Sequence, residues 1–128
     1  MSLNSSLAQY QQVSNSEAMS GASPHRLIQM LMEGSLKRMA EAKGAIQRGD
    51  VAKKGEAIGK AVSIIGGLRD SLNMDVEGGL SQQLDSLYEY MVGRLMQANI
   101  HRDESMVDEA MQIMITIKSG WDGIADQV

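Results

Sequence analysis

The chain has 128 residues, of which 43% are apolar and 22% charged, and its formal net charge is −4. This composition is typical of one globular domain, and its acidic balance gives no electrostatic basis for binding nucleic acid. The absence of cysteine excludes disulfides and thiolate ligands, and no run of about 18 apolar residues predicts insertion into a membrane.

Residues 1–22 form the first predicted element, a polar N-terminal segment rich in Ser, Asn, Gln and Ala. Its apolar residues recur every three or four positions, which predicts a short amphipathic helix. They are Leu3, Leu7, Tyr10 and Val13. The segment lacks the basic start and apolar run of a signal peptide, so we expect a cytoplasmic protein.

Residues 23–126 carry four helical patterns separated by turn residues. Ser23 before Pro24 is a helix start, Gly49 is a natural end, and Asp50 and Asp103 are suited to cap the helices that follow them. We expect helices at about 24–48, 51–73, 79–100 and 104–125.

Each pattern has one apolar stripe. In the third helix the stripe consists of Leu80, Leu84, Leu87, Met91, Leu95 and Ala98. Four such stripes with short connections predict an all-α fold, an antiparallel up-down-up-down four-helix bundle.

The eleven methionines indicate either a loosely shaped core or an adaptable binding surface. Met39, Met91 and Met114 follow the inward stripes, so we expect them in the core. Five others flank the stripes and are candidates for lining a groove: Met30, Met32, Met96, Met106 and Met111.

Catalytic and ligand-binding motifs are absent from the sequence. His25 and His101 fall at predicted helix ends, where we expect capping or surface roles, and no Glu-x-x-His pattern supports a metal site. No Gly-x-Ser-x-Gly motif occurs, and the Gly66-Gly67 pair lacks the lysine of a phosphate loop. Lys53-Lys54 is interpreted as a solvated helix start. We expect no enzyme activity, metal or cofactor.

The third helix carries two tyrosines on different sides. Tyr88 lies next to the inward stripe, whereas Tyr90 lies about 200° away from it at 3.6 residues per turn. Tyr90, Arg94 and Gln97 share this outer side, which is either an interaction surface or a solvated face.

Several blocks together resemble the FliS family of flagellin export chaperones. They are Ala-Ser-Pro-His-Arg-Leu-Ile at 22–28, Gly-Asp at 49–50, Lys-Gly-Glu-Ala-Ile at 54–58, Leu-Tyr-Glu-Tyr-Met at 87–91, Arg94-Leu95, Ala98-Asn99 and Trp121. Tyr10 and Val13 also resemble the family's Ala-Tyr-x-x-Val, with Gln9 in place of the alanine. The resemblance covers residues 8 to 124.

This resemblance implies a cytoplasmic bundle that binds the disordered C-terminal segment of flagellin, prevents premature polymerisation and assists delivery to the flagellar type III export apparatus. It implies that residues 1–22 are mobile and cover part of the bundle. The candidate flagellin-binding residues are Tyr10, Leu27, Leu31, Ile58, Val62, Ile65, Tyr88, Tyr90, Met91 and Arg94. A charged residue at Ile65 or Tyr88, both interpreted as stripe-edge positions, is expected to weaken flagellin capture.

The alternative is a structural or regulatory helical adaptor, because excess apolar surface also suits self-association or another flagellar partner. We expect a monomer or weak homodimer, with other flagellar export or regulatory proteins as further partners.

Overall fold

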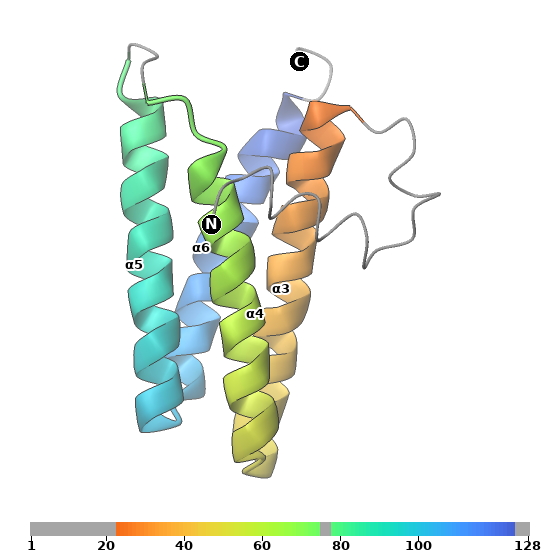
Figure 1. Ribbon diagram of the computed structural model, residues 1–128, viewed down its shortest axis with the longest axis vertical. Coiled ribbons are helices and arrows are strands. Elements are labelled where there is room, and N and C mark those ends of the chain that lie inside the picture. Colours follow the sequence, from red (N-terminus) through yellow and green to blue (C-terminus); the bar gives the residue numbers. More distant parts are fainter. Residues whose placement is uncertain (1–22, 75–77, 125–128) are drawn as a thin grey trace.

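The computed structural model describes residues 23–74 and 78–124, and within these ranges it contains four α-helices (Figure 1). They are α3 (Pro24–Arg48), α4 (Val51–Asp70), α5 (Leu80–His101) and α6 (Glu104–Gly123). Tyr10 and the rest of residues 1–22 lie outside the described residues.

The caps predicted from the sequence are present at three of the helix starts. The Ser23 hydroxyl accepts a hydrogen bond from the backbone N–H of Arg26 in α3. The Asp50 carboxylate accepts one from the backbone N–H of Lys53 in α4. Asp103 accepts from the backbone N–H of Ser105. Each bond satisfies a backbone donor that has no partner inside its own helix.

Sharp turns separate the first two helices and the last two. Gly49 ends α3 in the left-handed conformation with a φ of 69°, which costs glycine little because it has no Cβ. Arg102 ends α5 in the same region, with a φ of 54°. Each turn reverses the chain within two residues, which makes α3 and α4, and then α5 and α6, antiparallel neighbours.

The four helices pack as a closed antiparallel bundle in which α6 returns to lie against α3 (Figure 1). The predicted all-α four-helix bundle is therefore confirmed. The pairs are not equal: α3 and α4 share the most extensive contact, and α4 and α5 share the least extensive one.

The core is built from the inward stripes of all four helices. Met39, Met91 and Met114 are fully buried in it, as predicted. Met30 and Met32 are also buried, so the expectation that they line an exposed groove is wrong. The spacing of apolar residues predicts the side of α3 on which Met30 and Met32 lie. It does not predict how much of that side the neighbouring helices cover.

The stripe predicted for α5 is wrong at two positions, because Leu80 and Leu87 are exposed. Leu80 lies in the first turn of α5, and Figure 1 shows that α4 ends at a lower level than this turn. Leu87 lies at the edge of the stripe that contains the fully buried Met91.

His25 is buried rather than on the surface, because Trp121 of α6 covers it. The two rings stack with their centroids 4.6 Å apart and their planes within 5°. His25 Nε2 donates to the Trp121 carbonyl at 2.7 Å, and Trp121 Nε1 donates to the His25 carbonyl at 3.0 Å. This reciprocal pair joins the first turn of α3 to the last turn of α6.

Lys54 is likewise buried, contrary to the expectation of a solvated helix start. Its Nζ donates to the backbone carbonyl of Asn99 at 2.7 Å, in the last turn of α5. A cation is favourable there because the carbonyls at a helix C-terminus have no partner inside the helix and carry partial negative charge.

Candidate partner-binding surface

Five of the predicted binding residues lie inside the core, each at most 3% exposed. They are Leu31, Ile58, Ile65, Tyr88 and Met91. Ile65 and Tyr88 are therefore not at the edges of their stripes, and a charge at either position would first disrupt the fold. While the bundle is closed, these side chains cannot touch a partner.

The other described candidates do not form one site. Leu27 is half-buried on α3, and Val62 is half-buried on the side of α4 that turns toward α5. Tyr90 and Arg94 lie on the opposite side of α5, against Glu109 of α6.

An apolar surface runs along the edges of α4 and α5. On α4 it contains Val51, Gly55, Gly59, Val62 and Gly66, spaced three to four residues apart on the side that also carries Arg69. Val51 is 58% exposed although it is apolar. We call this set, together with its counterpart on α5, the α4–α5 face.

The α5 part of the face consists of Val92, Met96 and Ile100. Met96 is 55% exposed and Ile100 is 67% exposed, the highest value among the large apolar residues that the structure describes. Val92 and Met96 lie in the same row as Asp85 and Asn99, which contact α4. The row of face residues on α4 and the row on α5 are therefore neighbours. No side chain in the described ranges covers the exposed parts of these residues.

The glycines of the α4–α5 face leave open space above the helix backbone. A Cβ built at Gly55, Gly59 or Gly66 meets no heavy atom within 4 Å outside the local helix backbone. Contacts within the described molecule therefore do not require glycine at these positions, although glycine in a helix interior is about 0.5–1 kcal/mol less stable than alanine.

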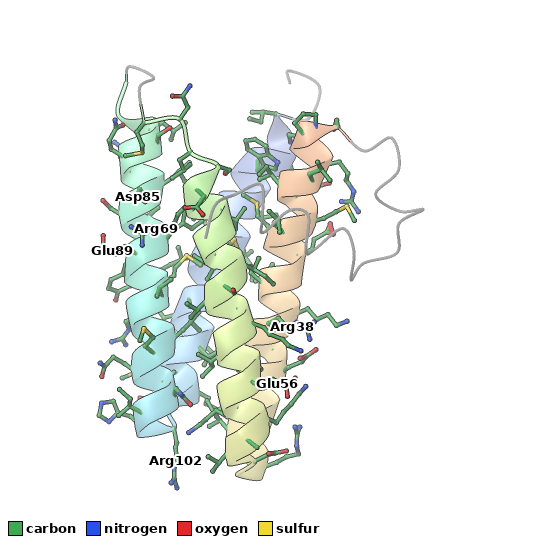
Figure 2. All side chains as sticks on the ribbon, viewed as in Figure 1. Arg38, Glu56, Arg69, Asp85, Glu89 and Arg102 are labelled. Carbon is green, nitrogen blue, oxygen red and sulfur yellow. The ribbon has the colours of Figure 1, made fainter. Side chains whose placement is uncertain are left out.

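Polar contacts close the α4–α5 face at its two ends. Lys54 contacts Asn99 at one end, and at the other Arg69 Nε donates to Asp85 Oδ1 at 2.8 Å (Figure 2). The hydrogen bond from Arg69 lowers the pKa of Asp85 below its ordinary value, more than desolvation raises it. Between these ends, Glu89 of α5 is the charged side chain on the face, 3.8 Å from Arg69.

A polar cluster joins α5 to α6 on the other side of α5. The Tyr90 hydroxyl donates to Glu109 Oε1 at 2.8 Å, and Arg94 Nε lies 2.6 Å from the same oxygen as an ion pair. The hydrogen bond to Glu109 raises the pKa of Tyr90 above its ordinary value. Tyr90 is exposed, as predicted, but its hydroxyl is already engaged within the molecule.

The side of the bundle formed by α3 and α4 is charged instead of apolar. Glu41 pairs with Arg38 at 3.2 Å and with Lys53 at 3.6 Å, and Glu56 pairs with Lys60 at 3.0 Å. Figure 2 shows Arg38 and Glu56 on this side, away from α5. Since these charges compensate one another in water, this side offers a partner little apolar area.

Sequence reasoning missed most of the α4–α5 face. Met96 was a candidate for lining a groove and Val62 a candidate contact, but Val51, Gly59 and Ile100 were not singled out. A signal was present, because glycines four residues apart inside a helical pattern have no local role in the helix. The exposure of Ile100 depends on how α5 packs against its neighbours. The spacing of apolar residues in the sequence does not predict it.

The described residues contain no group of three or more His, Cys, Asp and Glu side chains placed to hold a metal ion. No helix among them is both long enough and apolar enough to cross a membrane.

Comparison with known proteins gives one consistent family. Residues 6–128 match the family described as "Flagellar protein FliS". The chain is 51% identical over 119 residues to the flagellar secretion chaperone FliSB of Pseudomonas aeruginosa, covering 93% of this chain and 94% of the relative.

Two further relatives carry the name flagellar secretion chaperone FliS. The Vibrio cholerae protein is 43% identical over 122 residues, covering 95% of this chain and 90% of the relative. The Salmonella typhimurium protein is 38% identical over 122 residues, covering 94% and 90%.

Proposed function

The chain belongs to the FliS family of flagellar secretion chaperones, and from this premise we propose that it binds the disordered C-terminal segment of flagellin in the cytoplasm, prevents its premature polymerisation and assists its delivery to the flagellar type III export apparatus. The exposed α4–α5 face is the observation that supports this proposal most directly. Apolar surface of this kind on a small bundle is typical of a protein interaction site.

The chemistry of the face suits a partner that is disordered before it binds. Such a segment loses conformational entropy when it is ordered, and burial of apolar area must offset that loss. Because Met96 is 55% and Ile100 67% exposed, each contributes roughly 1–2 kcal/mol if a partner covers its remaining exposed part. A thioether such as that of Met96 also adapts to partners of imprecise shape.

Substitution on the face tests the proposal. Replacing Met96 or Ile100 by glutamate places a charge where the partner must exclude water, and we expect the affinity for monomeric flagellin to fall at least about tenfold. Isothermal titration calorimetry measures the affinity, and circular dichroism checks that each variant keeps its helix content.

Ile115→Glu is the matched control for this test, because Ile115 is an exposed apolar residue of α6, outside the α4–α5 face. It should bind flagellin as the unaltered chain does. Unchanged affinity in the Met96 and Ile100 variants would show that flagellin does not use this face.

The alternative function, a self-associating helical adaptor, is favoured by a separate observation. Leu80 and Leu87 are exposed on the side of α5 that turns toward α6, away from the α4–α5 face. Light scattering after size-exclusion chromatography separates the two functions. A dimer whose mass and stability do not change when flagellin is added would support the adaptor and contradict the chaperone.

A further inference from the structure

The methionines of the described structure differ sharply in their access to solvent. Met39, Met91 and Met114 have no exposed surface, because they lie in the core of the bundle. Met74 and Met96 are instead exposed, at 45% and 55%. A dissolved oxidant must reach the sulfur before it can oxidise a thioether, so we expect these two side chains to react well before the buried ones.

Met96 is surrounded on the α4–α5 face by residues that bring no side-chain hydrogen-bond donor. Val92 and Ile100 lie one turn before and one turn after it along α5. The polar contact at the nearer end of the face fixes the antiparallel register of α4 against α5, and this register places Gly55 and Gly59 at the level of Met96. A polar group at position 96 therefore depends on water for its hydrogen bonds.

Oxidation would turn Met96 into such a polar group. The sulfur lone pair attacks one oxygen of hydrogen peroxide, a sulfur–oxygen bond forms, the O–O bond breaks and water leaves. The sulfur is oxidised by two electrons and the peroxide is reduced, so the product is the sulfoxide, which is polar and accepts hydrogen bonds. A partner that covers the face removes the water from this acceptor and leaves it unpaired, which is costly.

We propose that Met96 is a site of reversible oxidation, at which a peroxide converts the thioether to the sulfoxide and thereby weakens capture of the exported partner. The bundle itself is preserved, because Met96 is not part of the buried core. The inference rests on the proposed function and adds a redox control of its binding surface. In the reverse step a methionine sulfoxide reductase removes the oxygen atom as water, while two thiols are oxidised to a disulfide.

Peroxide treatment of the chaperone alone tests the proposal. Catalase removes the remaining peroxide before untreated monomeric flagellin is added. Peptide mapping by mass spectrometry should find the sulfoxide at Met96 and Met74 before it appears at the buried methionines. Calorimetry should then show an affinity at least about tenfold lower, with unchanged helix content by circular dichroism. Methionine sulfoxide reductases for both epimers, supplied with dithiothreitol, should restore the affinity.

Two leucine variants assign the effect to one sulfur. Met96→Leu keeps a side chain of similar size and apolarity but cannot form a sulfoxide, so it should bind flagellin normally both before and after treatment. Met74→Leu is the matched control, because it removes the other exposed thioether, which lies in the turn after α4 and outside the face. Its affinity should fall on treatment as far as that of the unaltered chain.

Three results would overturn the oxidation site. They are an equal loss of affinity in treated Met96→Leu, an unchanged affinity in a chain that carries the sulfoxide at Met96, and a mapping in which Met96 reacts no faster than the buried methionines. Each of them leaves the chaperone function standing. Failure of the untreated chain to bind flagellin would overturn the proposed function itself, and the inference with it.

Discussion

Tyr88 lies within the core of the bundle, where its ring packs with the buried stripes of the other helices. Burial raises the pKa of its hydroxyl to about 12, because the phenolate is poorly solvated there. This residue was a candidate for contact with flagellin, and its position instead makes it a contributor to stability.

Alkaline unfolding provides a test at this residue. The unfolded chain releases the tyrosine proton near pH 10, whereas the folded chain holds it to about 12. The contribution of Tyr88 to stability is therefore complete below pH 10 and is lost as the pH rises toward 12, by roughly 3 kcal/mol in all. Urea unfolding of Tyr88→Phe should show a weaker fall in stability over this range.

Tyr90→Phe provides the comparison for the alkaline test, because the pKa of Tyr90 is also raised, by its surface hydrogen bond to Glu109, but less than that of Tyr88, so Tyr90→Phe should weaken the alkaline fall in stability less than Tyr88→Phe does. Flagellin affinity at neutral pH should be the same in Tyr88→Phe as in the unaltered chain. A Tyr88→Phe variant that unfolds in alkali with the unaltered pH dependence would show that the hydroxyl is not buried.

At the level of the helix, α4 contains glycines that its own packing does not need. Gly55, Gly59 and Gly66 all face open space and have none of the positive φ angles that make glycine necessary. Each one costs the helix about 0.5–1 kcal/mol relative to alanine. These glycines lower the stability of α4, and no contact inside the described molecule requires them. This combination is consistent with selection for an open binding surface.

Gly59→Ala should therefore raise the free energy of unfolding by about 0.5–1 kcal/mol, because alanine loses less backbone entropy on folding and its methyl group meets no atom. Chemical denaturation at neutral pH measures this gain. Gly49→Ala provides the contrast, since Gly49 has a φ of 69° and alanine there is strained and should destabilise the fold. A loss of stability in Gly59→Ala would mean that the space above α4 is occupied.

The pairing of α4 with α5 should weaken in acid. The pKa of Asp85 is lowered by its hydrogen bond from Arg69, so this contact stabilises the fold above the unfolded pKa of about 4 and is lost as the pH falls through the lower folded value. Asp85→Asn should be less stable than the unaltered chain at pH 6, and the difference should shrink by pH 2. Asp70→Asn is the control, because it removes a nearby exposed carboxylate and leaves the hydrogen bond between Arg69 and Asp85 in place.

The local features of the helices could be predicted, because caps and turns depend on a few adjacent residues. Ser23, Asp50 and Gly49 act as the sequence indicates. Burial was harder, because it depends on residues far away in the chain. His25 is covered by Trp121, which lies 96 positions later, and Ile100 is exposed because no helix lies opposite it. The same difference between local features and burial applies to the candidate site. The candidate residues with the strongest helical periodicity lie in the core rather than on a binding surface.

In the whole molecule, the four helices are joined unequally. The α3–α4 pair has the most extensive contact, whereas α5 has less extensive contacts with both of its neighbours. Polar contacts at the two ends hold α4 against α5, through Lys54 and Asn99 and through Arg69 and Asp85. The helix that carries Met96 and Ile100 thus packs less extensively than α3 and α4, as α6 also does.

Hydrogen exchange should show this inequality directly. Segments with fewer buried contacts open locally at a lower free energy, so central amides of α5 should exchange faster than those of α3 under native conditions. Lys54→Met removes the contact to Asn99 and should speed exchange in α5 further while leaving α3 unchanged, whereas Lys60→Met, which removes only an exposed pair with Glu56, should change neither. If flagellin binds the α4–α5 face as proposed, it should slow exchange in α5 more than in α3. Equal rates in α3 and α5 would show that the bundle opens only as one unit and that the weak α4–α5 contact has no dynamic consequence.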